Sequence, residues 1–362
     1  MNRTVLVCPL DWGIGHATRC IPLIHRLQEA GLEVVIAAGG RPLDVLRREF
    51  PDLITVEFPG TRVRYPAGGS MVFAMLRMTP RMLMGIRLEH RKLREIAAAY
   101  RAGLIISDNR YGCWHPDIPS VFITHQLEIR VPARLKMLSG LLRAISRHYI
   151  KKYRECWIPD FELHRGLAGD LSHPAKLPHH AYFIGILSRF AGRRDPYREA
   201  PRPGFDILVM LSGPEPQRTI LEEKILHQIV SIDMQVAMVR GMPESDEAYV
   251  LDGRIHVFSH LDGEKMEELI NRSALVICRS GYSSIMDIVT LGKAAILIPT
   301  PGQTEQEYLA RYLMEKKIYF SMDQENFDLL YAIEMSKNFP GMVMRNDMKF
   351  LDSRIRELAG LL

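Results

Sequence analysis

The amino-acid sequence predicts an α/β fold with two domains of similar size. Short runs rich in β-branched and apolar residues alternate with amphipathic helical patterns, as in proteins whose parallel strands are connected by helices. This alternation stops at Arg189–Gly204, a segment rich in Arg, Pro and Gly, and then resumes. The chain of 362 residues is also longer than a single hydrophobic core usually serves.

The first series of predicted elements starts near the first residue. Thr4–Leu10 has the composition of a buried strand, Thr18–Ala30 that of an amphipathic helix, and Leu32–Ala38 that of a second strand. Further strands are predicted at Leu53–Phe58, Leu104–Ser107, Ser120–Thr124 and Glu155–Ile158. We therefore expect residues 1–188 to form an N-terminal domain around a parallel sheet.

A second series follows the predicted linker, residues 189–204. Its strands are predicted at Asp206–Leu211, Met234–Val239, Ile255–Phe258, Leu275–Cys278 and Ala295–Ile298. Residues 205–362 are therefore expected to form a C-terminal domain, whose last helix is free to pack back onto the N-terminal domain.

The composition is that of an ordinary globular protein, with 47% hydrophobic and 25% charged residues and a formal net charge of +5. No apolar run reaches the ~18 residues of a membrane-spanning helix, and the three residues before the first predicted strand leave no room for a signal peptide. No His/Cys cluster or Asp-x-Asp motif has metal spacing, so neither a metal nor a bound cofactor is predicted. We expect a cytoplasmic protein with reduced thiols at Cys8, Cys20, Cys113, Cys156 and Cys278.

A glycine-rich turn lies between the first predicted strand and the first predicted helix, at Asp11–Arg19. Gly13 and Gly15 permit a tight turn and a close approach of a ligand to the backbone, and the helix behind them offers its N-terminus. A dinucleotide-binding turn is an alternative, although Thr18 occupies the place of the third glycine and the second strand ends without an acid. An oxidoreductase that uses a nicotinamide cofactor therefore stays an open alternative.

The most informative motif lies in the second half of the chain. A buried strand ends at Cys278, a turn of small residues follows, and a helix pattern then opens. This order leaves free backbone N–H groups and the positive end of a helix dipole at the carboxyl edge of the sheet, where phosphate binds. The predicted phosphate site is formed by Arg279, Ser280, Gly281, Ser283 and Ser284.

Polar side chains close to this turn suit a sugar nucleotide. Asp287 lies one turn into the helix, where a carboxylate can accept hydrogen bonds from ribose hydroxyls. Glu305 and Gln306 follow the next predicted strand and can reach sugar hydroxyls. Because ligands of open α/β sheets bind at the carboxyl ends of the strands, the sequence predicts a nucleotide-sugar donor site in the C-terminal domain.

Together these motifs resemble those of family 28 glycosyltransferases, which include the lipid II-forming N-acetylglucosaminyltransferases of peptidoglycan synthesis. Gly13–Arg19 resembles the N-terminal glycine loop of that family, and Cys278–Gly281 with Asp287 resembles its donor-binding motif. The similarity continues through Gly292-Lys293, Ile298-Pro299 and Glu305–Ala310. It implies the GT-B architecture, in which two Rossmann-like domains face each other across a cleft.

The resemblance also implies roles for residues outside these motifs. The implied additional donor-binding residues are Arg189, Ser212, Gly213 and Phe258, and the implied acceptor-side residues are Gly13, Gly15, His125 and Gln126. Leu309 stands where the family has an Asn that contacts the sugar, and Glu305 replaces a Gln, so the resemblance leaves the donor sugar open.

The expected reaction is the inverting, metal-independent transfer of a hexosyl or N-acetylhexosaminyl group from a UDP-type donor to an acceptor hydroxyl. A base must take the proton of the acceptor, and His16 and Asp108 are the two candidates. Besides the oxidoreductase, a sugar-nucleotide epimerase and a non-catalytic membrane-surface adaptor are alternatives.

Two basic segments lie in the N-terminal half. Met71–Arg94 has methionines crowded around Pro80 with arginines interleaved, a pattern typical of a segment that is buried or borders a lipid. Arg134–Arg154 has a helical pattern with one cationic face, for which a solvated domain helix is the simpler interpretation. We expect Met71–Arg94 to contact an anionic membrane surface and the acceptor to be lipid-linked. A nucleic-acid partner is not predicted, because no aromatic stacking platform accompanies the charges.

Overall fold

The computed structural model describes residues 3–58, 60, 71–129, 139–191, 204–344 and 348–362, with side chains from residue 82 onward in the helix that begins at Met71. The chain divides into two compact units. The first unit contains Met1–Arg64, Ser70–Arg189 and Asp347–Leu362, and the second contains Phe190–Asn346. Each unit has its own seven-stranded sheet and its own hydrophobic core.

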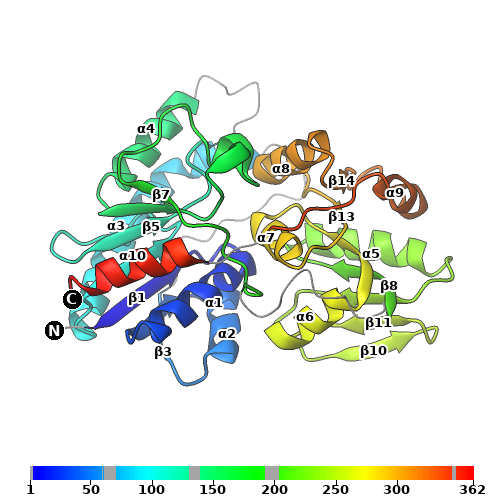
Figure 1. Ribbon diagram of the computed structural model, residues 1–362, viewed down its shortest axis with the longest axis horizontal. Helices are drawn as coiled ribbons and strands as arrows, with labels where there is room; N and C mark the ends of the chain where they lie inside the picture. The colour runs from blue at the N-terminus through cyan, green and yellow to red at the C-terminus, as the bar shows by residue number, and fades with distance from the viewer. Residues whose placement is uncertain (1–2, 59, 61–70, 130–138, 192–203, 345–347) are drawn as a thin grey trace. The chain divides into compact units, whose positions relative to one another are not determined.

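The first unit is built on a parallel sheet with the strand order β3-β2-β1-β4-β5-β6-β7 (Figure 1). Its strands are β1 (Thr4–Pro9), β2 (Glu33–Ala38), β3 (Ile54–Glu57), β4 (Leu104–Asp108), β5 (Ser120–Ile123), β6 (Glu155–Ile158) and β7 (Ala181–Phe183). Its helices are α1 (Ile14–Glu29), α2 (Gly40–Glu49), α3 (Met71–Ala99), α4 (Ser139–Ile150) and α10 (Lys349–Ala359). The direction of the strand order reverses between β1 and β4, which is where ligands of open α/β sheets bind.

The second unit has the strand order β10-β11-β9-β8-β12-β13-β14, with β10 antiparallel to β11 and the other pairs parallel. Its strands are β8 (Phe205–Met210), β9 (Val236–Val239), β10 (Ala248–Leu251), β11 (Ile255–Phe258), β12 (Ser273–Cys278), β13 (Ala295–Leu297) and β14 (Phe320–Ser321). Its helices are α5 (Gln217–Ile229), α6 (Gly263–Asn271), α7 (Tyr282–Thr290), α8 (Thr304–Glu315) and α9 (Leu329–Ser336). Here the order reverses between β8 and β12. The predicted class, two parallel α/β sheets connected by helices, is confirmed.

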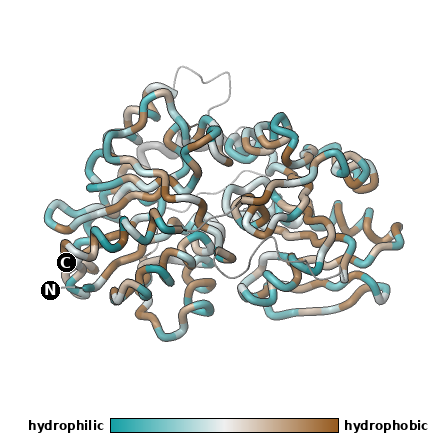
Figure 2. Tube along the Cα trace, viewed as in Figure 1, coloured by the Kyte–Doolittle hydropathy of each residue, from teal (hydrophilic) through white to brown (hydrophobic). Residues whose placement is uncertain are grey.

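Each core forms where apolar strand faces meet helices. In the first unit Leu6 and Val35 of the sheet pack with Leu93 and Ile96 of α3, all of them buried. In the second unit a core of the same kind packs the sheet against α5 and α9. Figure 2 shows hydrophobic residues following the strands of both sheets. This burial on both faces explains why the central strands appear in the sequence as nearly continuous apolar runs.

Several elements differ from those predicted. Helix α1 begins at Ile14, not at Thr18, because Gly13 adopts an extended conformation and caps a first turn that lacks the apolar periodicity of the rest. The edge strands β7, β10 and β14 were not predicted, since each has only two to four residues and none contributes a fully buried apolar run.

The last helix, α10, belongs to the first unit, where it lies beside α1 (Figure 1). Arg354 forms an ion pair with buried Glu155 of β6 and stacks its guanidinium 4.4 Å from the ring centre of Tyr182. Arg26 of α1 lies 3.5 Å from Asp352. These contacts tie the C-terminal helix to both β6–β7 and α1.

Within the described residues, no helix is long and apolar enough to cross a membrane. The same residues contain no group of three or more His, Cys, Asp or Glu side chains that could hold a metal ion. All five cysteines are buried free thiols.

Candidate active site

The first candidate residues lie where β1 passes into α1. Gly13 precedes the helix, and the backbone N–H of His16 donates to the carbonyl of Gly13 at 3.3 Å. Thr18 donates its hydroxyl to the carbonyl of Gly15 at 3.1 Å. Gly15 and His16 therefore lie in the first turn of α1, at the carboxyl end of β1, and not in a loop before the helix.

The two candidate bases lie side by side. Asp108 is the last residue of β4 and pairs with Pro9 at the end of β1. This register brings His16 Nδ1 to 2.8 Å from Asp108 Oδ2. Asp108 is buried, whereas the side chain of His16 keeps 19% of its surface exposed. The sequence left a choice between them, and the structure makes them one hydrogen-bonded pair.

A third member of this group, Arg19, was missed at the sequence level. It is buried on α1. Its Nε lies 2.9 Å from both carboxylate oxygens of Asp108, and its Nη2 also donates to Oδ1 of that carboxylate. Nη2 lies 2.8 Å from His16 Nδ1, and Nη1 lies 3.3 Å from Nδ1 of His125. The available signal was the spacing of three residues from His16, which places both side chains on one face of a helix.

Burial and charge act together on this group. Burial lowers the pKa of His16 below its usual 6.5, and Arg19 lowers it further, against the opposing effect of Asp108. Burial by itself would raise the pKa of Asp108, but Arg19 and His16 lower it below 3.8. At neutral pH the group therefore consists of a neutral imidazole, a carboxylate and a guanidinium.

The other acceptor-side residues follow β5. His125 is buried and contacts Arg19, and the backbone N–H of Gln126 donates to the hydroxyl of Thr124 at 3.0 Å. The predicted residues Gly13, Gly15, His16, Asp108, His125 and Gln126 thus all lie beyond the carboxyl ends of β1, β4 and β5, three adjacent strands.

A buried ion pair supports the same edge of the sheet. Arg110, just after β4, lies 2.9 Å from Glu89 of α3 and donates to the carbonyl of Phe58 at 2.8 Å. Its guanidinium also stacks 4.0 Å from the ring centre of Phe58. Asp11, next to the glycine turn, accepts from the backbone of Gly60 at 2.7 Å. These contacts hold α3 and the segment after β3 against the glycine turn.

In the second unit the predicted phosphate turn caps α7. Gly281 is the N-cap of the helix, and Ser283 and Ser284 lie in its first turn. A Cβ built on Gly281 would meet nothing within 4 Å, so open space lies next to the helix N-terminus. Gly213 has a φ of +104°, which favours glycine, and its missing Cβ would lie 3.8 Å from the hydroxyl of Thr300. The turns after β8, β12 and β13 are thus neighbours, as the strand order requires.

Side chains from these turns hold one another in place. The hydroxyl of buried Ser280 donates to the carbonyl of Gln306 at 2.8 Å, and the backbone of Thr300 donates to Gln306 Oε1 at 2.8 Å. Asp287 is buried on α7, Glu305 lies in the first turn of α8, and Phe258 ends β11. Ser212 lies in the loop after β8, and Arg189 is the residue at which the chain leaves the first unit for the second.

Arg279, predicted to meet phosphate, is buried and bound to the protein. It donates to the carbonyls of Pro299 and Gln217 at 3.2 and 2.7 Å and to Gln324 Oε1 at 2.6 Å. Burial lowers the pKa of its guanidinium to about 10. These bonds join the turn after β12 to the end of β13 and the start of α5, so the guanidinium organises the turns around the predicted phosphate site.

Comparison with known proteins assigns this second unit. Residues 214–338 match the glycosyltransferase family 28 C-terminal domain. The chain is a glycosyltransferase whose second unit contains a family 28 domain. The family resemblance expected from the sequence is thereby confirmed.

Two relatives of this glycosyltransferase align along most of its length. An uncharacterized glycosyltransferase of Methanopyrus kandleri is 22% identical over 322 residues, which cover 83% of this chain and 87% of that protein. A second relative, from Listeria welshimeri, is the UDP-N-acetylglucosamine–N-acetylmuramyl-(pentapeptide) pyrophosphoryl-undecaprenol N-acetylglucosamine transferase. It is 22% identical over 336 residues, which cover 88% of this chain and 87% of that protein.

Solved structures agree on the fold of the glycosyltransferase. The spinosyn rhamnosyltransferase SpnG matches 99% of this chain and 95% of its own, with a TM-score of 0.62 and 16% identity. Its complex with thymidine diphosphate matches with a TM-score of 0.60. The two sheets therefore have the GT-B architecture.

Proposed function

We propose that the protein transfers a sugar from a nucleoside diphosphate, of the UDP type, to an acceptor hydroxyl with inversion at the anomeric carbon and without a metal ion. The observation that carries this proposal is the His16–Asp108 pair at the carboxyl edge of the first sheet, in a chain whose second unit is a family 28 domain. A base and a predicted phosphate turn are the two groups that such a transfer requires.

His16 is the proposed general base. Its Nδ1 faces Asp108, so Nε2 is the ring nitrogen left to accept the proton of the acceptor hydroxyl. The lowered pKa keeps the imidazole neutral at neutral pH, which a base requires. Asp108 orients the ring and stabilises the imidazolium that forms as the acceptor oxygen attacks the anomeric carbon.

The second unit is proposed to bind the donor and to stabilise its leaving group. Negative charge develops on the departing phosphate, and the N-terminus of α7 at Gly281–Ser284 offers backbone N–H groups and a positive dipole end. The open space at Gly281 and the glycine turn at Gly213 support this placement. Asp287 is proposed to accept hydrogen bonds from the ribose, and Arg189 to meet the diphosphate.

Two similar proteins support a nucleoside diphosphate donor. The Listeria relative is named as a UDP-N-acetylglucosamine-dependent transferase, and the SpnG structure contains thymidine diphosphate. For this chain we propose a hexosyl or N-acetylhexosaminyl donor, since Leu309 and Glu305 depart from the pattern expected for N-acetylglucosamine.

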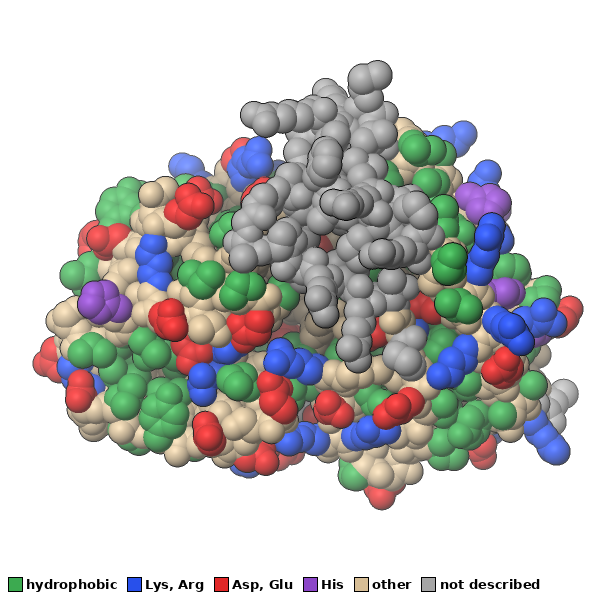
Figure 3. All heavy atoms as spheres, turned by 180° about the vertical axis from the view of Figure 1, so that it is seen from behind, with side chains coloured by type: hydrophobic (Ala, Val, Ile, Leu, Met, Phe, Trp, Pro, Cys, Tyr) green, Lys and Arg blue, Asp and Glu red, His purple; other side chains and the backbone are tan. Residues whose placement is uncertain are grey.

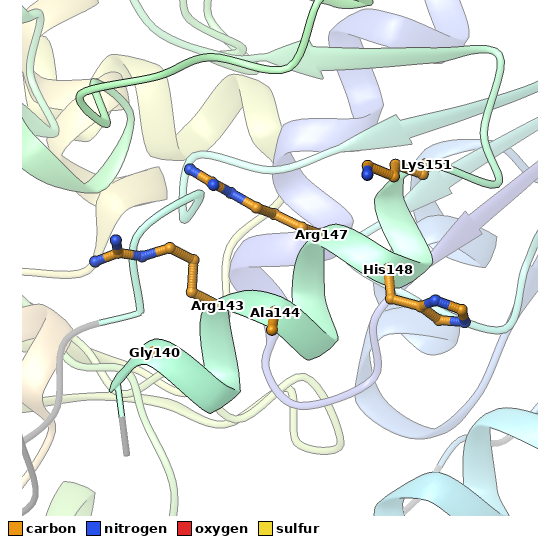
Figure 4. Close-up of a pocket in the computed structure, with 6 residues that line it drawn as sticks. All are labelled: Gly140, Arg143, Ala144, Arg147, His148 and Lys151. Atoms are coloured by element: carbon orange, nitrogen blue, oxygen red, sulfur yellow. The ribbon is translucent and has the colours of Figure 1, made fainter. Parts of the chain in front are cut away.

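We also propose that the protein binds peripherally at the cytoplasmic face of a membrane and that its acceptor is lipid-linked. The exposed side chains of α3 support this proposal. Met84 and Leu88 are 65% and 62% exposed and lie one turn apart, with exposed Arg87 and Arg91 beside them. The N-terminal part of the predicted segment, residues 71–81, lies outside the described side chains. A second basic surface lies on α4, where a groove of 360 Å³ is lined by Gly140, Arg143, Ala144, Arg147, His148 and Lys151 (Figure 4).

These basic groups are local features. On the face seen in Figure 3, the coloured Lys and Arg side chains are interspersed with Asp and Glu, so this face carries no broad field of one sign. A nucleic-acid partner is accordingly not part of the proposal.

A screen of nucleotide sugars by thermal shift, followed by calorimetry, tests the function. A preferred donor should raise the melting temperature progressively as its concentration rises above the dissociation constant, because it binds only the folded state. Nucleoside diphosphate should be released only when an acceptor is present. Interconversion of the sugar without nucleotide release would indicate an epimerase. A change in the absorbance of a nicotinamide cofactor would indicate an oxidoreductase. Vesicle binding without any donor binding would indicate an adaptor.

A further inference from the structure

The side chain of Arg19 joins both members of the proposed catalytic pair. It is 2% exposed, and its Nε lies 2.9 Å from both oxygens of Asp108. Its Nη2 lies 2.8 Å from His16 Nδ1, and its Nη1 lies 3.3 Å from Nδ1 of His125. The charge of this buried guanidinium is balanced by a carboxylate, and that carboxylate is the partner of the base.

The charges around the imidazole therefore differ from those of a simple His–Asp pair. An isolated carboxylate next to a histidine favours the protonated ring. Here Arg19 contacts the same carboxylate, so the negative and positive charges facing His16 cancel to first order. What remains is burial, which disfavours the imidazolium.

We propose that Arg19 is a positioning residue of the active site: it holds the carboxylate of Asp108 and cancels its charge, so that His16 meets the acceptor as an uncharged base. This inference rests on the proposed function only for the role of His16. The contacts themselves belong to the first unit and do not depend on the donor.

The hydrogen-bond geometry supports this division of roles. His16 Nδ1 lies 2.8 Å from both Asp108 Oδ2 and Arg19 Nη2, and one nitrogen cannot donate to the first and accept from the second at once. Arg19 Nη2 keeps Asp108 Oδ1 as an acceptor in either tautomer, whereas an Nδ1 lone pair would face Asp108 Oδ2 with no proton between them, so we assign the proton to Nδ1 and the lone pair to Nε2. In this tautomer Arg19 acts on His16 through its charge and through Asp108, and not by a hydrogen bond.

The other titratable groups facing the pair are few. In the part of the chain that the structure describes, they are His125 after β5 and Cys20 on α1, which is a buried thiol. Burial holds the pKa of Cys20 well above its usual value, so this thiol is uncharged at neutral pH. Among the described residues, Arg19 is therefore the fully charged group that opposes the charge of Asp108 next to His16.

Titration of the histidine ring signals by NMR tests the inference without requiring a substrate. The His16 signal is assigned from its loss in His16→Gln. In the wild type its midpoint should lie below 6.5, and in Arg19→Gln it should rise by about one pH unit or more, because a nearby charge shifts a pKa by roughly that amount. Arg19→Lys retains the charge and should keep the midpoint low, and Asp108→Asn should lower it further.

The opposite signs expected for Arg19→Gln and Asp108→Asn make the outcome decisive. An unchanged His16 midpoint in folded Arg19→Gln would overturn the inference. If that variant does not fold, a midpoint in Asp108→Asn that rises or stays constant would overturn it instead. Once a donor and an acceptor are known, the transfer rate can be measured as a function of pH. The acidic limb of that pH–rate profile should move with the NMR midpoint of His16. Absence of transfer in the wild type would refute the proposed function while leaving the NMR result intact.

Discussion

His16 Nδ1 lies 2.8 Å from Asp108 Oδ2, although 92 residues separate the two positions in the sequence. The contact follows from the parallel pairing of β1 with β4, in which Pro9 is the partner of Asp108. His16 follows after a turn of four residues, in the first turn of α1. The pair is thus a product of strand register and of the early start of the helix.

Replacement of His16 by Gln should abolish most of the transfer activity. A general base contributes roughly 10²–10⁴-fold to a rate, so kcat should fall by about that factor. Donor affinity should stay unchanged, since the proposed donor site belongs to the second unit. The rate is measured as nucleoside diphosphate release and the affinity by calorimetry. His148→Gln, an exposed histidine on α4, is the matched control. Retention of full activity in His16→Gln would remove this residue from the mechanism.

Replacement of Asp287 by Ala should weaken binding of the donor nucleotide. If the carboxylate accepts two hydrogen bonds from the ribose, its loss should reduce the binding free energy by roughly 1.5–3 kcal/mol. Calorimetry with the nucleoside diphosphate measures this change, and circular dichroism establishes folding. Glu264→Ala, an exposed acid on the neighbouring helix α6, should leave affinity unchanged. Equal affinity in folded Asp287→Ala and wild type would rule out the ribose contact.

The buried pair of Glu89 and Arg110 should stabilise the first unit. Glu89→Ala leaves a fully buried guanidinium without its carboxylate, which costs about 3–5 kcal/mol. Glu95→Ala on the same helix should change the free energy of unfolding by less than about 1 kcal/mol, because its partner Arg91 is exposed and 3.7 Å away. All three tryptophans, Trp12, Trp114 and Trp157, lie in the first unit, so tryptophan fluorescence in denaturant reports its unfolding. Equal losses in the two variants would contradict a specific role for the buried pair.

The protein should bind vesicles rich in anionic lipid at low ionic strength. Each exposed Arg near such a surface contributes about 1 kcal/mol, so Arg87→Gln with Arg91→Gln should reduce sedimentation with vesicles several-fold and leave donor affinity unchanged. Salt should release the protein as the screening length falls to about 3 Å at 1 M. Arg47→Gln with Arg48→Gln removes the same charge from exposed positions on α2 and is the control. If wild type fails to sediment with vesicles at low salt, the peripheral site is wrong.

Much of the fold was predictable from the sequence because strands buried on both faces are local signals. Runs such as Thr4–Leu10 and Leu275–Cys278 are apolar throughout and end in glycine or serine turns, so both their type and their approximate bounds follow from composition. Edge strand β10 lacks such a run and was missed, since antiparallel pairing at an edge needs little burial.

The candidate site was predictable only in part. Turns that bind ligands at strand ends carry glycines and small polar residues, which can be recognised in the sequence alone. For this reason Gly13, His16, Asp108 and Gly281 could be selected. The spacing of three residues from His16 was not enough to select Arg19 among the many arginines of the chain, because its role comes from being buried beside a carboxylate 89 residues away. Arg279 is the opposite case, because the sequence selected it as a residue that meets phosphate. Its place in the motif does not reveal that its guanidinium is bound to backbone carbonyls.

The sequence by itself determined the α/β class, the approximate strands and the residue types at the ligand turns, because periodicity and turn chemistry act over a few residues. Only the tertiary structure decided that His16, Arg19, Asp108 and His125 form one group, and that α10 returns to the first unit. Those contacts depend on strand order and register, which are set by the packing of segments far apart in the chain and leave no local pattern.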